Sequence, residues 1–355
     1  MAVPDAAVVV QAGERRLARL ESLRAIAALG VLIGHAWGFV HQFGPDALAT
    51  FGARVIYGGG FGVFLFFVLT GYLLFWPFVR RDYGDGTPVA LAGYARNRVL
   101  RILPLYFVAV AVPIVLSGDA GDLRLWARFG LLAQNFSADT VAHGVNPVLW
   151  SVIVEVHFYV LLPLLAAGLA VLARGSRGRA ALLVAALGGL GLAVRLITVV
   201  APVLPSPLWV YNLPANFVFF VPGMLLALLR LELEQRPRAL GSSALWMAAS
   251  GAVWLVVFAD YDLQPLAAVA GFLLVGSCCL PLQESRARRA LDARPLAALG
   301  VASYSLYVWG GLVQERFPDS AAGQLVAVPV ALAVAAVSYR LVERPFLALR
   351  QRWSG

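Results

Sequence analysis

Long runs of apolar residues, separated by short polar segments, recur along the whole chain. A helix that crosses a bilayer needs about 20 mostly apolar residues. The runs predict ten transmembrane helices, near 22–41, 58–79, 99–116, 148–173, 180–200, 213–230, 244–259, 265–282, 298–314 and 322–342. The seventh and ninth runs are the shortest. The pattern therefore predicts an all-α, polytopic helical bundle.

The composition excludes other classes of protein. Of the 355 residues, 61% are hydrophobic and 13% are charged. Soluble domains contain about 25% charged residues, and disordered chains are poor in apolar residues, so neither class fits. The two cysteines, Cys278 and Cys279, are neighbours within an apolar run and predict neither a disulfide nor a metal site. We expect no metal elsewhere in the chain.

The net charge of +9 carries information about orientation, because the sequence contains Arg but no Lys. With the N-terminus in the cytoplasm, 22 of the 28 Arg residues fall on the cytoplasmic side, and two, Arg24 and Arg195, lie within spans. The opposite side holds Arg54, Arg124, Arg128 and Arg316. This bias predicts that both termini are cytoplasmic. It leaves no support for nucleic-acid binding.

We expect a single membrane domain over 21–346. It is flanked by a cytoplasmic N-terminal segment, 1–20, and a cytoplasmic tail, 347–355. The first span begins some twenty residues into the chain without a cleavage site, which favours a retained helix over a signal peptide. The longest stretch between spans, 117–147, is too short for a catalytic domain. Chemistry is therefore expected among the membrane helices or at their ends.

Arg24 and His35 are ionisable residues within the first span, and such residues mark functional sites because they are costly in a membrane. Eleven residues of α-helix place both side chains on one face, about 16 Å apart along the axis. Two simpler interpretations remain open. Arg24 can extend to the headgroups, and His35 can form a hydrogen bond between packed helices.

Glu155 lies about two turns into the fourth span, at a depth similar to that of His35. A carboxylate and an imidazole at one level can pair, and such a pair orients the ring for service as a general base. Ser151 lies one turn away on the same face of that helix. In the alternative interpretation, Arg195 of the fifth span pairs with Glu155, which would make the carboxylate structural.

Arg98 and Arg101 open the third span with a spacing that places both guanidinium groups on one side of the helix. Arg24 should lie at the same level. Arginine forks suit phosphate groups, so these three residues predict a seat for a phosphorylated donor. Alternatively, these arginines only orient the protein in the membrane and have lipid phosphates as their partners. The glycines at 58–62 and the hydroxyls at 303–309 are, in isolation, more typical of helix packing.

Six motifs, in order and with matching spacing, resemble the acyltransferase-3 family of bacterial membrane O-acyltransferases, which have a ten-helix core. They extend from Arg19 to Phe346 and comprise Arg24 with His35, Gly62–Tyr72, Arg98–Tyr106, Leu149–Tyr159, Ser303–Trp309 and Val342–Phe346. Two positions depart from the family pattern. Gly310 stands where a His is common, and Val156 and His157 follow Glu155 in place of a polar residue and Gln.

The resemblance implies transfer of an acyl group, often acetyl, from acyl-coenzyme A to a hydroxyl, in the bacterial inner membrane. Typical acceptors are sugars of surface polysaccharides, lipid-linked glycans or glycosylated natural products such as macrolides. By position, Arg24 and His35 match the functional dyad of the family, Arg98 and Arg101 its cytoplasmic Arg pair, and Glu155 its carboxylate. Candidate substrate-binding residues are Ser151, Tyr159, Arg195 and Tyr307.

We therefore expect His35 to act as general base on the acceptor hydroxyl, oriented by Glu155, with the donor phosphates on Arg98, Arg101 and Arg24. No Ser or Cys nucleophile held by a base is evident, which favours direct transfer. A transporter or flippase for glycan or lipid precursors is the alternative, with Arg24, His35 and Glu155 as a proton relay. Nothing specific favours a non-catalytic sensor.

Overall fold

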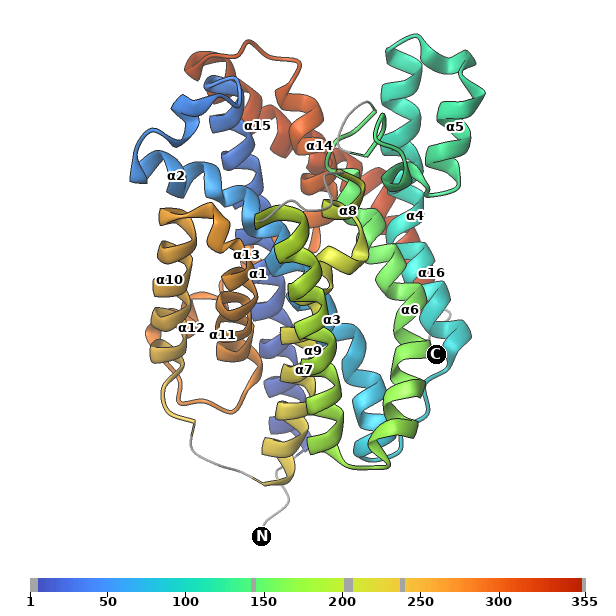
Figure 1. Cartoon of the computed structure of the whole chain (residues 1–355), viewed down its shortest axis with the longest axis vertical. Coiled ribbons are helices and arrows are strands. Elements are labelled where there is room, and N and C mark those ends of the chain that lie inside the picture. The colour runs from blue at the N-terminus through green and yellow to red at the C-terminus, as the bar shows by residue number, and fades with distance from the viewer. Residues whose placement is uncertain (1–5, 142–144, 201–206, 237–239, 353–355) are drawn as a thin grey trace.

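The computed structural model describes residues 6–141, 145–200, 207–236 and 240–352. In this part of the chain the regular structure is helical, apart from one isolated bridge between Ser242 and Gln283. The long helices run side by side in one bundle (Figure 1). The prediction of an all-α, multi-pass membrane protein is confirmed.

Eight helices or joined helices of the described residues are long and apolar enough to cross a membrane. They span Glu14–Val40, Phe51–Tyr83, Leu91–Leu116, Leu149–Ala173, Arg177–Val199, Leu208–Gln235, Tyr261–Cys279 and Ala321–Leu349. Each overlaps one predicted span. They contain α1 (Ala6–Val40), α2 (Phe51–Tyr57), α3 (Gly62–Tyr83), α4 (Leu91–Leu116), α6 (Leu149–Ala173), α7 (Arg177–Arg195), α8 (Pro207–Val210), α9 (Leu213–Gln235), α11 (Ala267–Cys279), α15 (Ala321–Ser338) and α16 (Arg344–Arg352).

The two shortest predicted spans are the two that depart from a simple crossing helix. The seventh is α10 (Ser243–Ala259), an apolar helix of 17 residues. The ninth is broken, because α13 (Arg294–Val301) and α14 (Ser303–Gln314) meet at an angle of 70°. The break places the N-terminus of α14, with its hydroxyl-rich sequence, among the other helices.

The helix boundaries extend beyond those predicted for the membrane domain at both ends. Helix α1 begins at Ala6 rather than near residue 21, and α16 continues to Arg352, past residue 346. Ala, Leu, Glu and Arg favour helix irrespective of solvent, so the helices continue past the apolar runs into more polar sequence. The stretch between α4 and α6 contains a short helix, α5 (Leu123–Gly130).

Helices α3 and α9 form the closest seam of the bundle. A β-carbon at Gly71 of α3 would overlap the carbonyl oxygen of Phe220, and one at Gly223 of α9 would overlap that of Val68. The two backbones are therefore in direct contact, as small residues permit between membrane helices. Thr70, the residue before Gly71, is held in place by this seam.

Arg19 joins α1 to the segment that follows α11. Its guanidinium donates from Nε and Nη2 to the carboxylate of Asp292, at 2.7 and 2.9 Å, and from Nη1 and Nη2 to that of Glu284, at 3.0 and 3.2 Å. Only 4% of the residue is exposed. We call this arrangement the Arg19 clamp. It fixes the beginning of α1 against the turn between α11 and α13.

Candidate functional site

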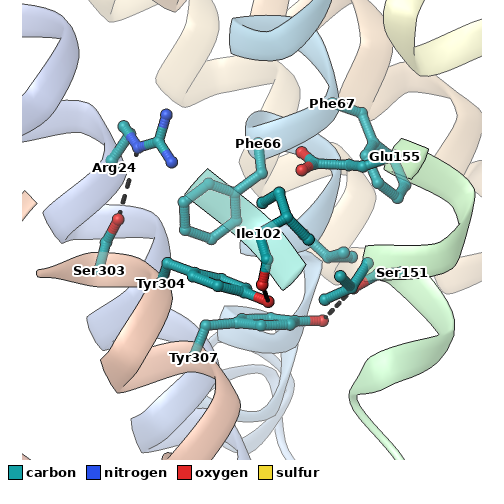
Figure 2. A pocket seen from close by; sticks show the side chains of 11 residues that line it. Arg24, Phe66, Phe67, Ile102, Ser151, Glu155, Ser303, Tyr304 and Tyr307 are labelled. Atoms are coloured by element: carbon teal, nitrogen blue, oxygen red, sulfur yellow. Dashed lines mark hydrogen bonds between the residues drawn. The ribbon is translucent and has the colours of Figure 1, made fainter. Parts of the chain in front are cut away.

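Arg24 and Glu155 face one narrow cavity from α1 and α6 (Figure 2). Its volume of about 40 Å³ is enough for ordered water. We call it the Arg24 cavity. Its walls are built from five helices: α1, α3, α4, α6 and α14. The lining residues are Arg24, Val63, Phe66, Phe67, Ile102, Ser151, Val152, Glu155, Ser303, Tyr304 and Tyr307.

The Glu155 carboxylate is held by two hydroxyls. Thr70 Oγ1 donates to Oε1 at 2.8 Å, and Tyr159 OH donates to Oε2 at 2.6 Å. Thr70 comes from the α3–α9 seam, and Tyr159 lies one turn further along α6. These bonds hold the carboxylate in place beside the cavity. Arg24 lies across the cavity from it (Figure 2).

Ser151 and Tyr307 form the opposite end of the cavity. Their hydroxyls are 2.7 Å apart, and both residues are buried (Figure 2). Two of the predicted substrate-binding residues are thus brought together. Tyr304 donates to the carbonyl oxygen of Ile102 at 3.1 Å, so it closes the wall between α14 and α4. The hydroxyls of α14 line the cavity, although the sequence alone favoured a packing role for them.

Arg24 retains hydrogen-bonding capacity. Its Nε lies 3.4 Å from Ser303 Oγ and 3.7 Å from Glu21 Oε2. The guanidinium also lies over the ring of Phe66, with 5.8 Å between Cζ and the ring centroid. Among the described residues, no hydrogen bond from the two terminal nitrogens is found. Arg24 is therefore a partly buried cation, with a side chain 20% exposed, that lines the cavity and keeps donors available among the described residues.

Arg101 is paired with Glu343, a carboxylate that the sequence analysis included in a motif but did not assign to the site. Its Nη1 lies 3.0 Å from Oε1 of Glu343, which has a side chain only 1% exposed. Glu343 belongs to a π-helical turn, η7 (Tyr339–Glu343), and accepts from Ser305 Oγ at 2.9 Å near the N-terminus of α14. A carboxylate at a helix N-terminus is favourable. In the sequence, the signal that could have pointed to Glu343 is a single acidic residue at the end of an apolar run.

Arg98 faces a different side of α4 from Arg101. It lines an apolar groove of about 450 Å³ between α4 and α6, and its Cζ lies 5.9 Å from the centroid of the Tyr159 ring. Its Nε is buried without a hydrogen-bond partner in the described structure. Tyr159 and Ile102 separate this groove from the Arg24 cavity. The expectation that Arg98 and Arg101 share one side of α4 is therefore wrong. Arg24, Arg98 and Arg101 face different surroundings, and Arg101 is neutralised by its own partner.

His35 lines a second, larger cavity of about 340 Å³, which we call the His35 cavity. Aromatic side chains form much of its wall, namely Phe43, Tyr57, Phe61, Phe64, Trp150 and Tyr211. Arg195 and Gln264 supply the other polar groups besides His35. Asn135 fixes two parts of this wall, since its Nδ2 donates to the carbonyl oxygens of Trp150 at 2.8 Å and Tyr211 at 2.7 Å.

The expected pair between His35 and Glu155 is not formed. Glu155 faces the Arg24 cavity and is engaged by Thr70 and Tyr159, whereas His35 faces the other cavity. Equal depth along two helices does not bring side chains together when a third helix lies between them. That helix is α3, whose Val63 lines both cavities.

The alternative pair between Arg195 and Glu155 is not formed either. Arg195 ends α7, where a π-helical turn, η5 (Leu196–Val200), follows. Its guanidinium donates to Asn216 Oδ1 at 3.2 Å and to Gln264 Oε1 at 2.5 Å. Arg195 therefore lines the same cavity as His35 and not the cavity that Glu155 faces. Tyr57, Tyr211 and Gln264 were missed in the sequence, because uncharged side chains near helix ends are common and give no signal.

The chain is similar to known proteins. The family described as an acyltransferase domain matches residues 17–340. Nodulation protein 10 of Rhizobium leguminosarum bv. viciae is 26% identical over 369 residues, covering 92% of this chain and 92% of that protein. A Staphylococcus aureus (strain COL) protein named as an O-acetyltransferase is 28% identical over 169 residues, covering 42% of this chain and 25% of its own. No solved structure matches the chain.

The family match covers five of the six motifs, all but Val342–Phe346, and nearly all of the described bundle, including the helices that form both cavities. It favours the enzyme interpretation over the transporter alternative. The chain belongs to the acyltransferase-3 family and is a membrane acyltransferase.

Proposed function

We propose that the protein transfers an acyl group from acyl-coenzyme A to a hydroxyl of a sugar or glycan, with His35 as general base. The observation that carries the proposal is the pair of adjoining cavities. One holds Arg24 and a hydrogen-bonded carboxylate, the other holds His35, and only the α3 side chain Val63 is shared by both walls. A donor and an acceptor can thus approach one point from two directions.

The arginine side fits a phosphorylated donor. Arg24 has terminal nitrogens without a hydrogen bond among the described residues, and the Nε of Arg98 is buried without a partner. The unsatisfied buried Nε of Arg98 is costly, and phosphate oxygens would accept from the donors of both residues. Arg101 is engaged by Glu343, so we assign it to holding α4 against η7 and α14. Because the Arg24 cavity has a volume of only about 40 Å³, donor binding must widen it.

On the acceptor side, His35 would take the proton of the acceptor hydroxyl. The oxygen then attacks the thioester carbonyl, an ester bond forms, and the carbon–sulfur bond breaks. The proton passes from His35 to the departing thiolate, which leaves as the thiol. Glu155 is too well engaged by Thr70 and Tyr159 to orient His35 directly. We assign it to balancing the charge of Arg24 across the cavity.

The sidedness of the reaction follows from the Arg distribution. If the Arg-rich side is cytoplasmic, the donor reaches Arg98 and Arg24 from the cytoplasm. His35, eleven residues further along α1, then lies about 16 Å nearer the outer face. In a bacterial inner membrane, this would let a cytoplasmic donor acylate an acceptor presented from outside.

The test is thiol release from acetyl-coenzyme A by the purified full-length chain, with and without a sugar acceptor. His35→Ala should lower the rate at least about a hundredfold, since a positioned base contributes 10²–10⁴-fold. His41→Ala is the matched control, because His41 packs on the ring of Trp37 at 4.4 Å and lies outside the proposed chemistry. A His35→Ala rate within threefold of the wild-type rate would refute the general-base assignment.

A further inference from the structure

Arg195 is a buried cation without a carboxylate partner. It is 4% exposed, and its hydrogen-bond partners are neutral: the side chains of Asn216 and Gln264 and the carbonyl oxygen of Val210 at 3.4 Å. The rings of Phe64 and Phe219 lie beside it, at 5.4 and 5.5 Å from Cζ. Among the described residues, no Asp or Glu forms an ion pair with it.

The remainder of the sequence offers no hidden partner. The only acidic side chain outside the described residues is Asp5, which is distant from Arg195 in the sequence. Residues 201–206, which follow Arg195 closely, read Ala-Pro-Val-Leu-Pro-Ser. An arginine stays protonated in proteins, so the charge persists.

An isolated buried charge is costly unless something else balances it. Arg195 also has an unsatisfied donor, because its Nε is buried and has no hydrogen-bond partner. The residue lines the His35 cavity, and its position at the junction of α7 with a π-helical turn aims it there. Such turns occur frequently at functional sites. By contrast, the arginines around the Arg24 cavity have Glu21, Glu155 and Glu343 nearby.

We propose that the His35 cavity takes an acceptor that carries a negatively charged group, a carboxylate or a phosphate, which binds Arg195. This deepens the proposed function, because it names the class of acceptor that His35 would deprotonate. The aromatic wall would cover the uncharged body of the acceptor, and Gln264 would hold the guanidinium in place. The anion can belong to a soluble sugar acid or to a lipid phosphate.

The experiment measures binding to the full-length protein in detergent micelles, without any donor. The soluble probes are glucuronate and methyl glucoside, which have the same ring and differ in charge. The lipid probes are a polyprenyl phosphate and the corresponding polyprenol. Dissociation constants come from the rise in the melting temperature with probe concentration. We expect at least one anion to bind at least tenfold more tightly than its neutral counterpart.

Preference for glucuronate alone indicates a sugar acid, and preference for polyprenyl phosphate alone indicates a lipid-linked acceptor. Arg195→Gln should reduce the preference to less than twofold, and Arg195→Lys should retain part of it. The proposal is wrong if wild-type protein binds each anion and its neutral counterpart equally, whether or not the variants fold. It is also wrong if Arg195→Gln keeps the full preference.

Binding without donor separates this inference from the proposed function. If the protein prefers the anion but releases no thiol from acetyl-coenzyme A, the anion site is supported and the acyl transfer is refuted. If it acylates neutral sugars and shows no preference for the anion, the acyl transfer is supported and the anion site is refuted.

Discussion

Arg19 and Arg24 are five residues apart on α1, yet their surroundings differ completely. Arg19 donates four hydrogen bonds to the carboxylates of Asp292 and Glu284 and is almost fully buried. Arg24 has one long hydrogen bond, to Ser303, and a distant approach to Glu21. The first guanidinium is saturated by the protein, whereas the second keeps donors available.

The difference shows how a structural cation is distinguished from a binding cation. A guanidinium has five N–H donors. The number of these donors that form hydrogen bonds within the protein indicates whether the residue joins parts of the structure or is available to bind a ligand. By this measure Arg19 joins helices, and Arg24 and Arg98 are available to ligands. Arg101 is assigned to structure because it forms an ion pair with Glu343, and Arg195 to ligand binding because its partners are neutral and its Nε has no partner. All are Arg residues in or near spans, so their charge alone does not separate the two groups.

The largest effect is expected at the Arg19 clamp. Arg19→Gln removes the partner of Asp292 and leaves Glu284 only its ion pair with Arg288. It should lower the free energy of unfolding by about 3 kcal/mol, the low end for a broken buried pair because both acids are partly exposed. The melting temperature in detergent should fall accordingly. Thiol release measured well below that temperature should stay close to the wild-type rate. A large loss of activity with unchanged melting would place Arg19 in the site instead.

Arg24→Gln makes the same chemical change one and a half turns along the helix, with the opposite outcome. Loss of hydrogen bonds from a charged donor to phosphate costs about 1.5–3 kcal/mol, which corresponds to roughly a ten- to hundredfold rise in the donor KM. The melting temperature should change little, because few protein contacts are lost. If donor KM is unaltered and the melting temperature drops as in Arg19→Gln, the two arginines do not differ in role.

The smallest expected effect concerns Arg101 and Glu343, which we assign to structure. Their contribution is measured by a double-mutant cycle of Arg101→Gln, Glu343→Gln and the double variant. The coupling energy in the melting experiment should be about 1 kcal/mol, in the range for residues in contact. A coupling near zero, combined with a raised donor KM in Arg101→Gln alone, would move Arg101 to the donor seat.

The sequence predicted the fold well because the membrane makes hydrophobic runs diagnostic of helices. Eight predicted spans overlap helices long enough to cross, and the two exceptions are the runs at 244–259 and 298–314. Run length could not reveal the 70° break between α13 and α14, since both halves are apolar. The position of an arginine along α1 or α4 indicates its depth, but it did not reveal that Arg24, Arg98 and Arg101 have separate surroundings.

The partners of the ionisable residues could not be predicted in the same way. Depth along a helix says nothing about which neighbour lies between two side chains, and α3 separates His35 from Glu155. The Glu155 hydrogen bonds from Thr70 and Tyr159 depend on the rotation of α3 against α6. That rotation is set by packing of whole helices, which a single sequence does not display.

The backbone contact between α3 and α9 has a practical consequence for protein engineering. Positions 71 and 223 accept no side chain without displacement of the partner helix, so a combinatorial library that varies them would consist mostly of unfolded members. The side chains of Tyr57, Tyr211 and Gln264 line the His35 cavity and lie outside that contact. A library directed at new acceptors should therefore diversify those three positions and keep both glycines constant.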